Sequence, residues 1–476
     1  MIGKIIKIFG KSKIEFLLVF SFVICLSSIN SVPDDFFEFF ALKEKNFFNY
    51  FNFYRFIASV IIIILLSFFF RFKKNTNKLL LYFFFFGAWQ IIIFTIKSNN
   101  PINYIVNYQL ILNSISILLI FFLADQYKVE LEKKILFVLI IYISAISLFF
   151  CLKLIFEFFN NEKLLYLYGT DALQPESKIF GQATPRVTGV ARMCLIIFYF
   201  IFFLQININN KFLKVTALII SFFLILVIYA TQTRGAIIGI VIFIIFYFFW
   251  FKEGLIKKIF FIFFIIIIPI ITFEGIIYLK KNFYKKHLNE TTLKTGNVID
   301  SRIATNTSSS GRIEIWKTSL KIIKEKKIIL GYGPQADRLL LSEPQGKKIL
   351  NSRIPIYDNN SSNALIYSYL CGGILSFIFF LIIYFLILKQ IFIFLFIKRE
   401  IIKKNSLVNF SLVTLIFLTA RTVFENGYAV FGVDYLFCLT CYFILMKSYK
   451  IKKNQYLFLR KFKILFFSTK KYFSFK

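Results

Sequence analysis

The sequence is poor in the residues that most enzymes use for acid–base and metal chemistry. Its 476 residues include one histidine, and 24 Asp and Glu stand against 58 Lys and Arg. The six cysteines lie in or beside apolar runs, and none forms a metal-type cluster with the histidine. Cys438 and Cys441 have a redox-type spacing, but they fall within an apolar run and are interpreted as small hydrophobic side chains.

The scarcity of acidic residues leaves a formal net charge of +34. Such a charge is typical of nucleic-acid binding proteins, but here it accompanies 58% hydrophobic residues. Lys, Asn, Ile and Phe are all abundant, as an AT-rich genome would produce, so part of the lysine excess is compositional. We therefore expect a membrane partner and no nucleic acid.

Long hydrophobic runs dominate the chain and predict an all-α polytopic membrane protein with about twelve transmembrane helices. Each run has roughly the 20 residues that a helix needs to cross about 30 Å of hydrocarbon. The least certain division is between the seventh and eighth spans, where only Thr231–Arg234 intervenes and the turn must be tight. The predicted spans are 14–32, 52–70, 79–96, 104–124, 135–156, 189–205, 212–230, 235–251, 256–278, 363–388, 407–424 and 429–446.

The basic residues are distributed unevenly between alternate loops. One set of short loops carries clusters such as Lys73–Lys74, Lys133–Lys134 and Lys403–Lys404, and the opposite set carries few basic residues. By the positive-inside rule, this asymmetry predicts that both termini lie in the cytoplasm. No cleavable signal peptide is expected, and the protein is predicted to reside in the bacterial inner membrane.

The runs also suggest a division of the chain into four parts. Residues 1–278 contain spans one to nine, residues 279–362 form a large periplasmic loop, residues 363–446 contain spans ten to twelve, and residues 447–476 form a basic cytoplasmic tail. Within the loop, Ile313, Trp316, Leu320 and Ile323 share one helical face. This pattern predicts an amphipathic helix that lies on the membrane surface or caps the bundle.

Arginine recurs at the outer end of the membrane. Charge within a bilayer is costly, so each such residue needs a partner or a function. Arg421 has two possible ion-pair partners in the sequence, Glu425 one helical turn further on and Asp434. No acidic residue near Arg234 or Arg312 in the sequence is suitable as an ion-pair partner. A guanidinium group matches two phosphate oxygens at once, so clustered arginines favour a lipid-linked phosphate or pyrophosphate, although snorkelling anchors and ion pairs are alternatives. The arginines concerned are Arg186, Arg192, Arg234, Arg312 and Arg421.

Five short motifs resemble elements of the O-antigen ligase and polymerase family, in the family's order. Thr231-Gln-Thr-Arg234-Gly resembles its Ser/Thr-x-Ser/Thr-Arg-Gly element, and Ser310-Gly-Arg312 followed by Trp316 resembles its Ser-Gly-Arg-x-x-x-Trp element. The other three are Arg186-Val-Thr-Gly189, Gly331-Tyr-Gly-Pro334, and Asn363 with Gly372-Gly373. The resemblance covers roughly residues 183–380.

This resemblance implies an inverting, metal-independent glycosyltransferase with a GT-C-like fold and no cofactor. Family members take a glycan from undecaprenyl pyrophosphate on the periplasmic face and pass it to lipid A core or to another lipid-linked repeat. It further implies that Arg234 and Arg312 are catalytic and hold the pyrophosphate, which is electrostatic stabilisation of the transition state. The expected substrate-binding residues are Arg186, Arg192, Trp316, Asn363 and Arg421.

One departure from the family pattern concerns the catalytic base. Ligases carry a histidine before the asparagine at the head of the tenth span, where this chain has Ser362. The base is then Asp358, Glu425 or Asp434, or no strong base is needed because pyrophosphate is a good leaving group. The single histidine, His287, is interpreted as an ordinary loop residue. The missing histidine favours a polymerase or a ligase-like relative over a ligase proper.

Two other functions remain open. Asp34 and Asp35, just after the first span, have the character of a divalent-metal site in lipid-phosphosugar glycosyltransferases, although acids also mark an ordinary helix start. Twelve spans and interior arginines also suit a flippase or exporter of lipid-linked oligosaccharide. Transporters, however, usually contain internal repeats, which this sequence lacks.

Overall fold

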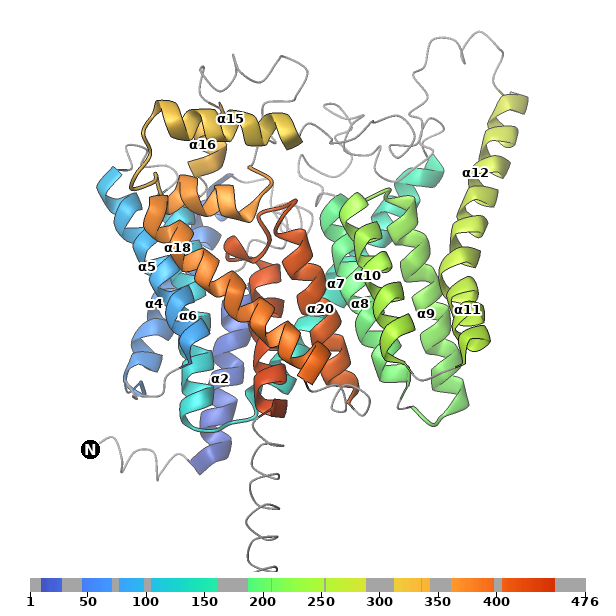
Figure 1. Ribbon diagram of the computed structural model, residues 1–476, viewed down its shortest axis with the longest axis horizontal. Helices are drawn as coiled ribbons and strands as arrows, with labels where there is room; N and C mark the ends of the chain where they lie inside the picture. Colours follow the sequence, from blue (N-terminus) through green and yellow to red (C-terminus); the bar gives the residue numbers. More distant parts are fainter. Residues whose placement is uncertain are drawn as a thin grey trace, which may run out of the picture.

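The computed structural model of the chain is a bundle of helices with a pair of short helices across one end (Figure 1). The described part is helical throughout and contains no strand. It comprises residues 10–27, 45–70, 77–97, 104–160, 187–206, 208–251, 254–287, 312–334, 336–342, 361–397 and 405–449.

The helices follow the apolar runs of the sequence closely. The first half of the chain forms α2 (Gly10–Ser27), α4 (Lys45–Ser67), α5 (Lys78–Lys97), α6 (Tyr104–Gln126), α7 (Leu131–Asn160) and α8 (Val187–Gln205). The second half forms α9 (Lys211–Ala230), α10 (Arg234–Trp250), α11 (Leu255–Ile262), α12 (Ile268–His287), α15 (Arg312–Glu325), α16 (Ala336–Ser342), α18 (Ala364–Phe392) and α20 (Ser406–Arg421). A last helix spans 433–449.

Five of the described helical segments are long and apolar enough to cross a membrane. They are Lys78–Ile96, Leu131–Leu152, Lys211–Ala230, Leu255–Lys280 and Ala364–Ile397. Shorter apolar helices include Gly189–Gln205, Arg234–Trp250 and Ser406–Arg421. The chain is therefore a multi-pass helical membrane protein, while the count of twelve spans and the GT-C-like architecture stay predictions.

Helix α8 is enclosed in the bundle and is packed by α7, α9, α10 and α20. Its residues are almost all buried, and the Tyr199 hydroxyl donates a hydrogen bond to the Gly239 carbonyl of α10 (2.6 Å). Aromatic rings fill the space around it, such as Phe202 and Phe243 with centroids 4.7 Å apart. Because lipid gives no hydrophobic drive for helix association, such close packing holds the bundle together. It also fixes Arg192, which α8 carries near its first turn.

Two membrane helices depart from regular α geometry where the sequence demands it. A π-helical turn, Phe263–Ile267, joins α11 to α12 directly before Pro269, which has no N–H and cannot sit in a regular turn. The resulting helix continues to His287, nine residues beyond the predicted end of the ninth span. The residues after 278 that were expected to open the loop therefore begin as helix.

Helix α18 breaks at Gly372 and Gly373, whose backbone angles are not helical (Gly373 φ 64°, ψ −156°). Breaking a helix inside a membrane frees backbone groups that must find other partners. The segment before α16 supplies them: Tyr332 N–H donates to Leu370 O (3.0 Å), and Gly333 N–H donates to Cys371 O (2.7 Å). We call this set of bonds the loop–α18 seam.

Further bonds complete the loop–α18 seam. Ile374 N–H donates to Ile329 O (3.0 Å), and Trp89 Nε1 on α5 donates to Gly372 O (2.8 Å). Gly331 has a φ of +81°, and a side chain there would meet the Gly372 nitrogen at 2.5 Å, so only glycine allows this approach. The seam anchors α15 and α16 across the end of the bundle opposite the start of α2 (Figure 1).

Candidate functional site

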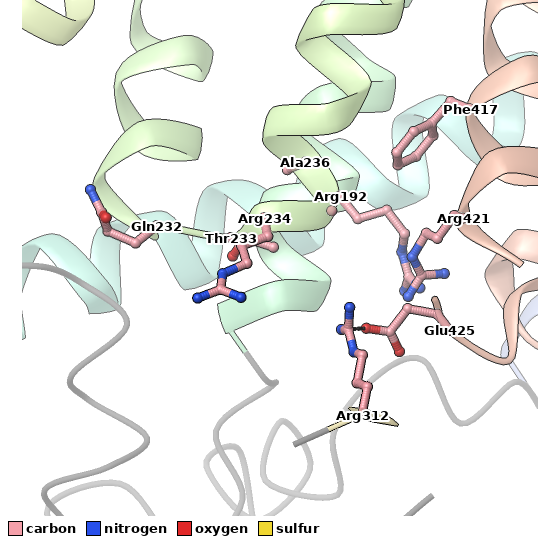
Figure 2. A pocket seen from close by; sticks show the side chains of 10 residues that line it. Arg192, Gln232, Thr233, Arg234, Ala236, Arg312, Phe417, Arg421 and Glu425 are labelled. Atoms are coloured by element: carbon pink, nitrogen blue, oxygen red, sulfur yellow. Dashed lines mark hydrogen bonds and ion pairs between the residues drawn. The ribbon is translucent and has the colours of Figure 1, made fainter. Parts of the chain in front are cut away.

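A cavity lies where the starts of α8, α10 and α15 meet the end of α20. It contains about 510 Å³ of space free of protein atoms, part of it open to solvent. Four of the described residues that line it are arginines, and Figure 2 shows their side chains gathered around one space. The lining comprises Arg192, Gln232, Thr233, Arg234, Gly235, Ala236, Arg312, Phe417, Arg421 and Glu425.

Arg234 and Arg312 are the first residues of α10 and α15. The turn between α9 and α10 is as tight as expected, with Thr231 and Gln232 as its hinge and Gln232 at a φ of +51°. Both residues line the cavity; in Figure 2 the guanidinium group of Arg312 lies beside Arg192, Arg421 and Glu425, whereas that of Arg234 lies to one side, toward Gln232. Each helix also places the positive end of its dipole at this cavity. The structure thus brings together the two residues predicted to be catalytic.

Arg312 pairs with Glu425, with 2.7 Å between Nη2 and Oε1. The sequence reading found no suitable acidic partner near Arg312, and this partner comes from 113 residues further on. Both side chains are about one quarter exposed. The Glu425 carboxylate therefore occupies the guanidinium group at the edge of the cavity, where a ligand can compete for it.

Arg192 and Arg421 share a different carboxylate, Asp434, in the first turn of the last helix. Arg192 Nη1 lies 3.1 Å from Asp434 Oδ2, and Arg421 Nη1 donates to the same oxygen. Asp434 is 4% exposed, so this arrangement is buried much more deeply than the Arg312–Glu425 pair. Of the two partners considered for Arg421, the structure selects Asp434 and leaves Glu425 to Arg312.

The charges of these groups do not cancel. Among the residues that the structure describes, four guanidinium groups face two carboxylates, Glu425 and Asp434, which gives this described set a net charge of +2. Positive charge concentrated around a cavity favours an anionic ligand. The forked donors of arginine are suited to phosphate oxygens.

Helix α15 has the predicted position in the chain. Ile315 and Ile322 are buried against α16 and α18, whereas Ile313 and Leu320 are 46% and 56% exposed. The helix therefore packs on the bundle through a face other than the one with Ile313 and Leu320, and the membrane-surface position of that apolar face stays a prediction. Trp316 is half-buried, and its Nε1 donates to the Ser362 carbonyl (3.3 Å), which ties α15 to the start of α18.

Asn363 caps α18 and ties it to the end of α20. Its side-chain oxygen accepts hydrogen bonds from Leu365 N–H (2.9 Å) and Ile366 N–H (3.1 Å). Its side-chain nitrogen donates to Val423 O (3.0 Å), two residues before Glu425. The structure thus gives Asn363 a positioning contact next to the cavity, and it is not among the residues that line it.

Asp337 was missed by the sequence reading. It is 1% exposed in α16, and its Oδ2 accepts hydrogen bonds from Ser361 N–H (2.9 Å) and Asn426 Nδ2 (3.2 Å). Asn426 directly follows Glu425, so Asp337 ties α16 to the segment that holds the cavity carboxylate. The available signal was an acidic residue in the first turn of a helix, which is usual for solvent-exposed helices as well.

Several predicted residues lie outside the described part of the chain. These are Arg186, Asp358, Asp34 and Asp35. No cluster of three potential metal-ligating side chains occurs among the described residues. His287 ends α12, far in the sequence from the cavity residues.

The fold and the cavity define a class: a multi-pass helical membrane protein with an arginine-lined cavity at one end. Residues 218–381 match the family model described as O-antigen ligase, and this match confirms the resemblance to the O-antigen ligase and polymerase family. The matched segment contains Arg234, Arg312, Trp316, Asn363 and both halves of the loop–α18 seam. No curated protein matches the chain. The family implies a glycosyltransferase-type enzyme of polysaccharide biosynthesis that acts on lipid-linked glycans.

Proposed function

We propose that the protein transfers a glycan from an undecaprenyl-pyrophosphate donor to a hydroxyl acceptor, either lipid A core or another lipid-linked repeat, on the periplasmic face of the inner membrane. The carrying observation is one cavity whose described lining includes four arginines, Arg192, Arg234, Arg312 and Arg421. A diphosphate diester bears two negative charges, and the forked donors of arginine are suited to its oxygens. The match of residues 218–381 to the O-antigen ligase model supports the same assignment.

In this reaction the acceptor oxygen forms a bond to the anomeric carbon of the donor sugar, and the bond from that carbon to the phosphate oxygen breaks. Undecaprenyl diphosphate leaves with one more negative charge than the bound donor had. We assign the stabilisation of that added charge to Arg234 and Arg312, because donors aimed at developing charge lower the barrier most. Attack from the face opposite the leaving group inverts the sugar configuration, and no residue of this set requires a metal.

The acceptor hydroxyl loses its proton in this reaction, and we propose Glu425 as the general base that accepts it. In the free protein its carboxylate pairs with Arg312 at 2.7 Å. When a donor phosphate takes over Arg312, Glu425 loses that partner and becomes free to accept the proton of the acceptor hydroxyl. Asp434 is less suited, because both Arg192 and Arg421 hold its Oδ2 and it is almost fully buried.

The test uses membranes that contain the protein, preformed lipid-linked donor and acceptor, and no nucleotide sugar. We expect glycan transfer, unaffected by chelator, because the residues assigned to catalysis are arginines and a carboxylate. A flippase would yield no transferred glycan, and a metal-dependent transferase that uses Asp34 and Asp35 would stop on addition of chelator. Deletion of the gene and a gel of surface polysaccharide then separates a ligase from a polymerase. Loss of all long chains indicates a ligase, and a single repeat left on the core indicates a polymerase.

Arg312→Lys is the sharpest variant of the same test. A lysine keeps the charge but loses the two-pronged donor, so we expect a loss of transfer of roughly 100-fold or more with normal insertion. Lys321→Arg is the matched control, because Lys321 lies on the same helix in an exposed pair with Glu325. Transfer by Arg312→Lys at the rate of Lys321→Arg contradicts the assignment.

A further inference from the structure

A second cavity lies at the far end of the bundle from the arginines. Helix α18 and the last helix both begin beside the arginine cavity and reach this second cavity further along. Along the last helix, Asp434 and Met446 are separated by about 18 Å of helix axis. The cavity is open to its surroundings and contains about 680 Å³ of space free of protein atoms, part of it outside the protein surface. Its lining comprises Asn77, Lys78, Asp125, Leu386, Lys389, Gln390, Ile393, Tyr442 and Met446.

The polar side of this cavity has a small positive excess. Lys78 at the start of α5 and Lys389 near the end of α18 face one carboxylate, Asp125, which leaves a net charge of +1 for the lining. Within the described part of the chain neither lysine has an ion-pair partner, and both are exposed at the rim. Asn77 is already engaged, because its oxygen accepts from Leu79 N–H (3.0 Å) and its nitrogen donates to Met446 Sδ (2.9 Å). The two ammonium groups therefore remain for a ligand.

The other side of the cavity is apolar. Leu386, Ile393, Tyr442 and Met446 form it, and they lie between α18 and the last helix. The adjoining surface of α18 carries exposed aromatic side chains, with Phe385 at 62% and Phe392 at 57%. Such a surface suits hydrocarbon, so the cavity opens beside a region in contact with lipid chains. A ligand that binds both the lysines and the apolar side chains needs an anionic headgroup and an apolar tail, and such a ligand would enter from the membrane.

We propose that this cavity binds one anionic membrane phospholipid. Its phosphodiester lies between Lys78 and Lys389, and an acyl chain follows Leu386 and Ile393 along α18. Basic pockets between membrane helices are known to hold anionic headgroups in this way. The single negative charge of a glycerol-type headgroup matches the excess of +1, and its hydroxyl groups can donate to Asp125 and Gln390. A choline headgroup contains a quaternary ammonium group, whose positive charge is repelled by Lys78 and Lys389.

The experiment measures lipid retention by the purified full-length protein with native mass spectrometry, using phosphatidylglycerol or phosphatidylcholine with the same acyl chains. We expect one tightly held phosphatidylglycerol in the wild-type protein. The double variant Lys78→Gln/Lys389→Gln should bind it roughly thirtyfold more weakly, since each lysine contributes to anionic-lipid affinity. Lys78→Arg/Lys389→Arg keeps both charges and should retain the lipid.

The matched control is Lys211→Gln/Lys214→Gln. These lysines open α9, whose first turn is capped by Asn210 as α5 is by Asn77, and neither lines the arginine cavity or the second cavity. Both lysines are exposed, so the control variant removes two positive charges, as the test variant does, but leaves the second cavity unchanged. Equal loss of lipid in the two glutamine variants overturns the proposal, and so does equal retention of phosphatidylcholine. Displacement of the bound lipid by millimolar glycerol 3-phosphate would identify a soluble phosphate as the ligand instead and also overturns it.

Discussion

The seam between the loop and α18 makes a quantitative prediction for Gly331→Ala. The new Cβ would lie 2.5 Å from the Gly372 and Gly373 nitrogens, whereas real Cβ contacts stay beyond 3.0 Å. The two backbones must therefore separate by about 0.5 Å, which stretches the Tyr332–Leu370 bond from 3.0 Å to near the outer limit of a hydrogen bond. Each buried group that loses its partner costs about 1–3 kcal/mol, and the φ of +81° adds about 1–2 kcal/mol for a residue with a Cβ. We expect a total destabilisation of about 2–5 kcal/mol.

The assay is thermal unfolding of the purified protein in detergent, followed by glycan transfer after reconstitution. We expect a lower midpoint for Gly331→Ala and reduced transfer, because the loop–α18 seam positions α15 and with it Arg312. Gly275→Ala is the control, since no atom lies within 4 Å of a Cβ built at Gly275 in α12. If Gly331→Ala and Gly275→Ala share the wild-type midpoint and activity, the seam does not hold the loop and the reasoning fails.

Three further predictions test the surroundings of the arginine cavity. Asp434→Asn removes the counter-charge of Arg192 and Arg421 and should lower the stability by about 3–5 kcal/mol in the same unfolding assay; an unchanged midpoint would show that the shared carboxylate is dispensable. Asn363→Ala and Asn405→Ala each remove a helix cap and should each lower the free energy of unfolding by about 1 kcal/mol. Only Asn363 also donates a hydrogen bond to Val423 beside the cavity, so only Asn363→Ala should reduce glycan transfer. The Cys151 and Cys194 sulfurs are 3.8 Å apart on α7 and α8, so mild oxidation with copper phenanthroline should link them in a peptide map; recovery of both as free thiols would mean that the helices are held apart.

The helix bounds were largely readable from the sequence, because the apolar runs have sharp ends. The run predicted at 79–96 forms Lys78–Lys97, and the one predicted at 212–230 forms Lys211–Ala230. The continuation of α12 to His287 was not readable, since a polar helix beyond the membrane has no hydropathy signal. The π-turn before Pro269 was likewise absent from the prediction, although proline gives a local reason for it.

The contacts between distant segments were the part that the sequence could not provide. On the helical wheel of α15, the face with Ile313 and Leu320 is as apolar as the face with Ile315 and Ile322, and only packing against α16 and α18 selects the second. Similarly, the pairing of Arg312 with Glu425 depends on how α15 docks on the end of α20. The motif spacing predicted which arginines matter, and their roles in catalysis stay predictions until the variants are assayed.

The carboxylate shared by Arg192 and Arg421 also bears on biosynthesis. Asp434 follows Arg192 by 242 residues, so at usual translation rates it emerges from the ribosome about 10–50 s later. During that interval Arg192 on α8 has no native counter-ion in the membrane, and Arg421 on α20, 13 residues before Asp434, lacks one for only about the last 1–3 s. Each unpaired guanidinium group costs about 2.5–3.5 kcal/mol on the insertion scale. A chain that stalls or is truncated before the last helix keeps this penalty. We therefore expect the helical bundle to reach its full stability only once the last helix, which carries Asp434, has inserted.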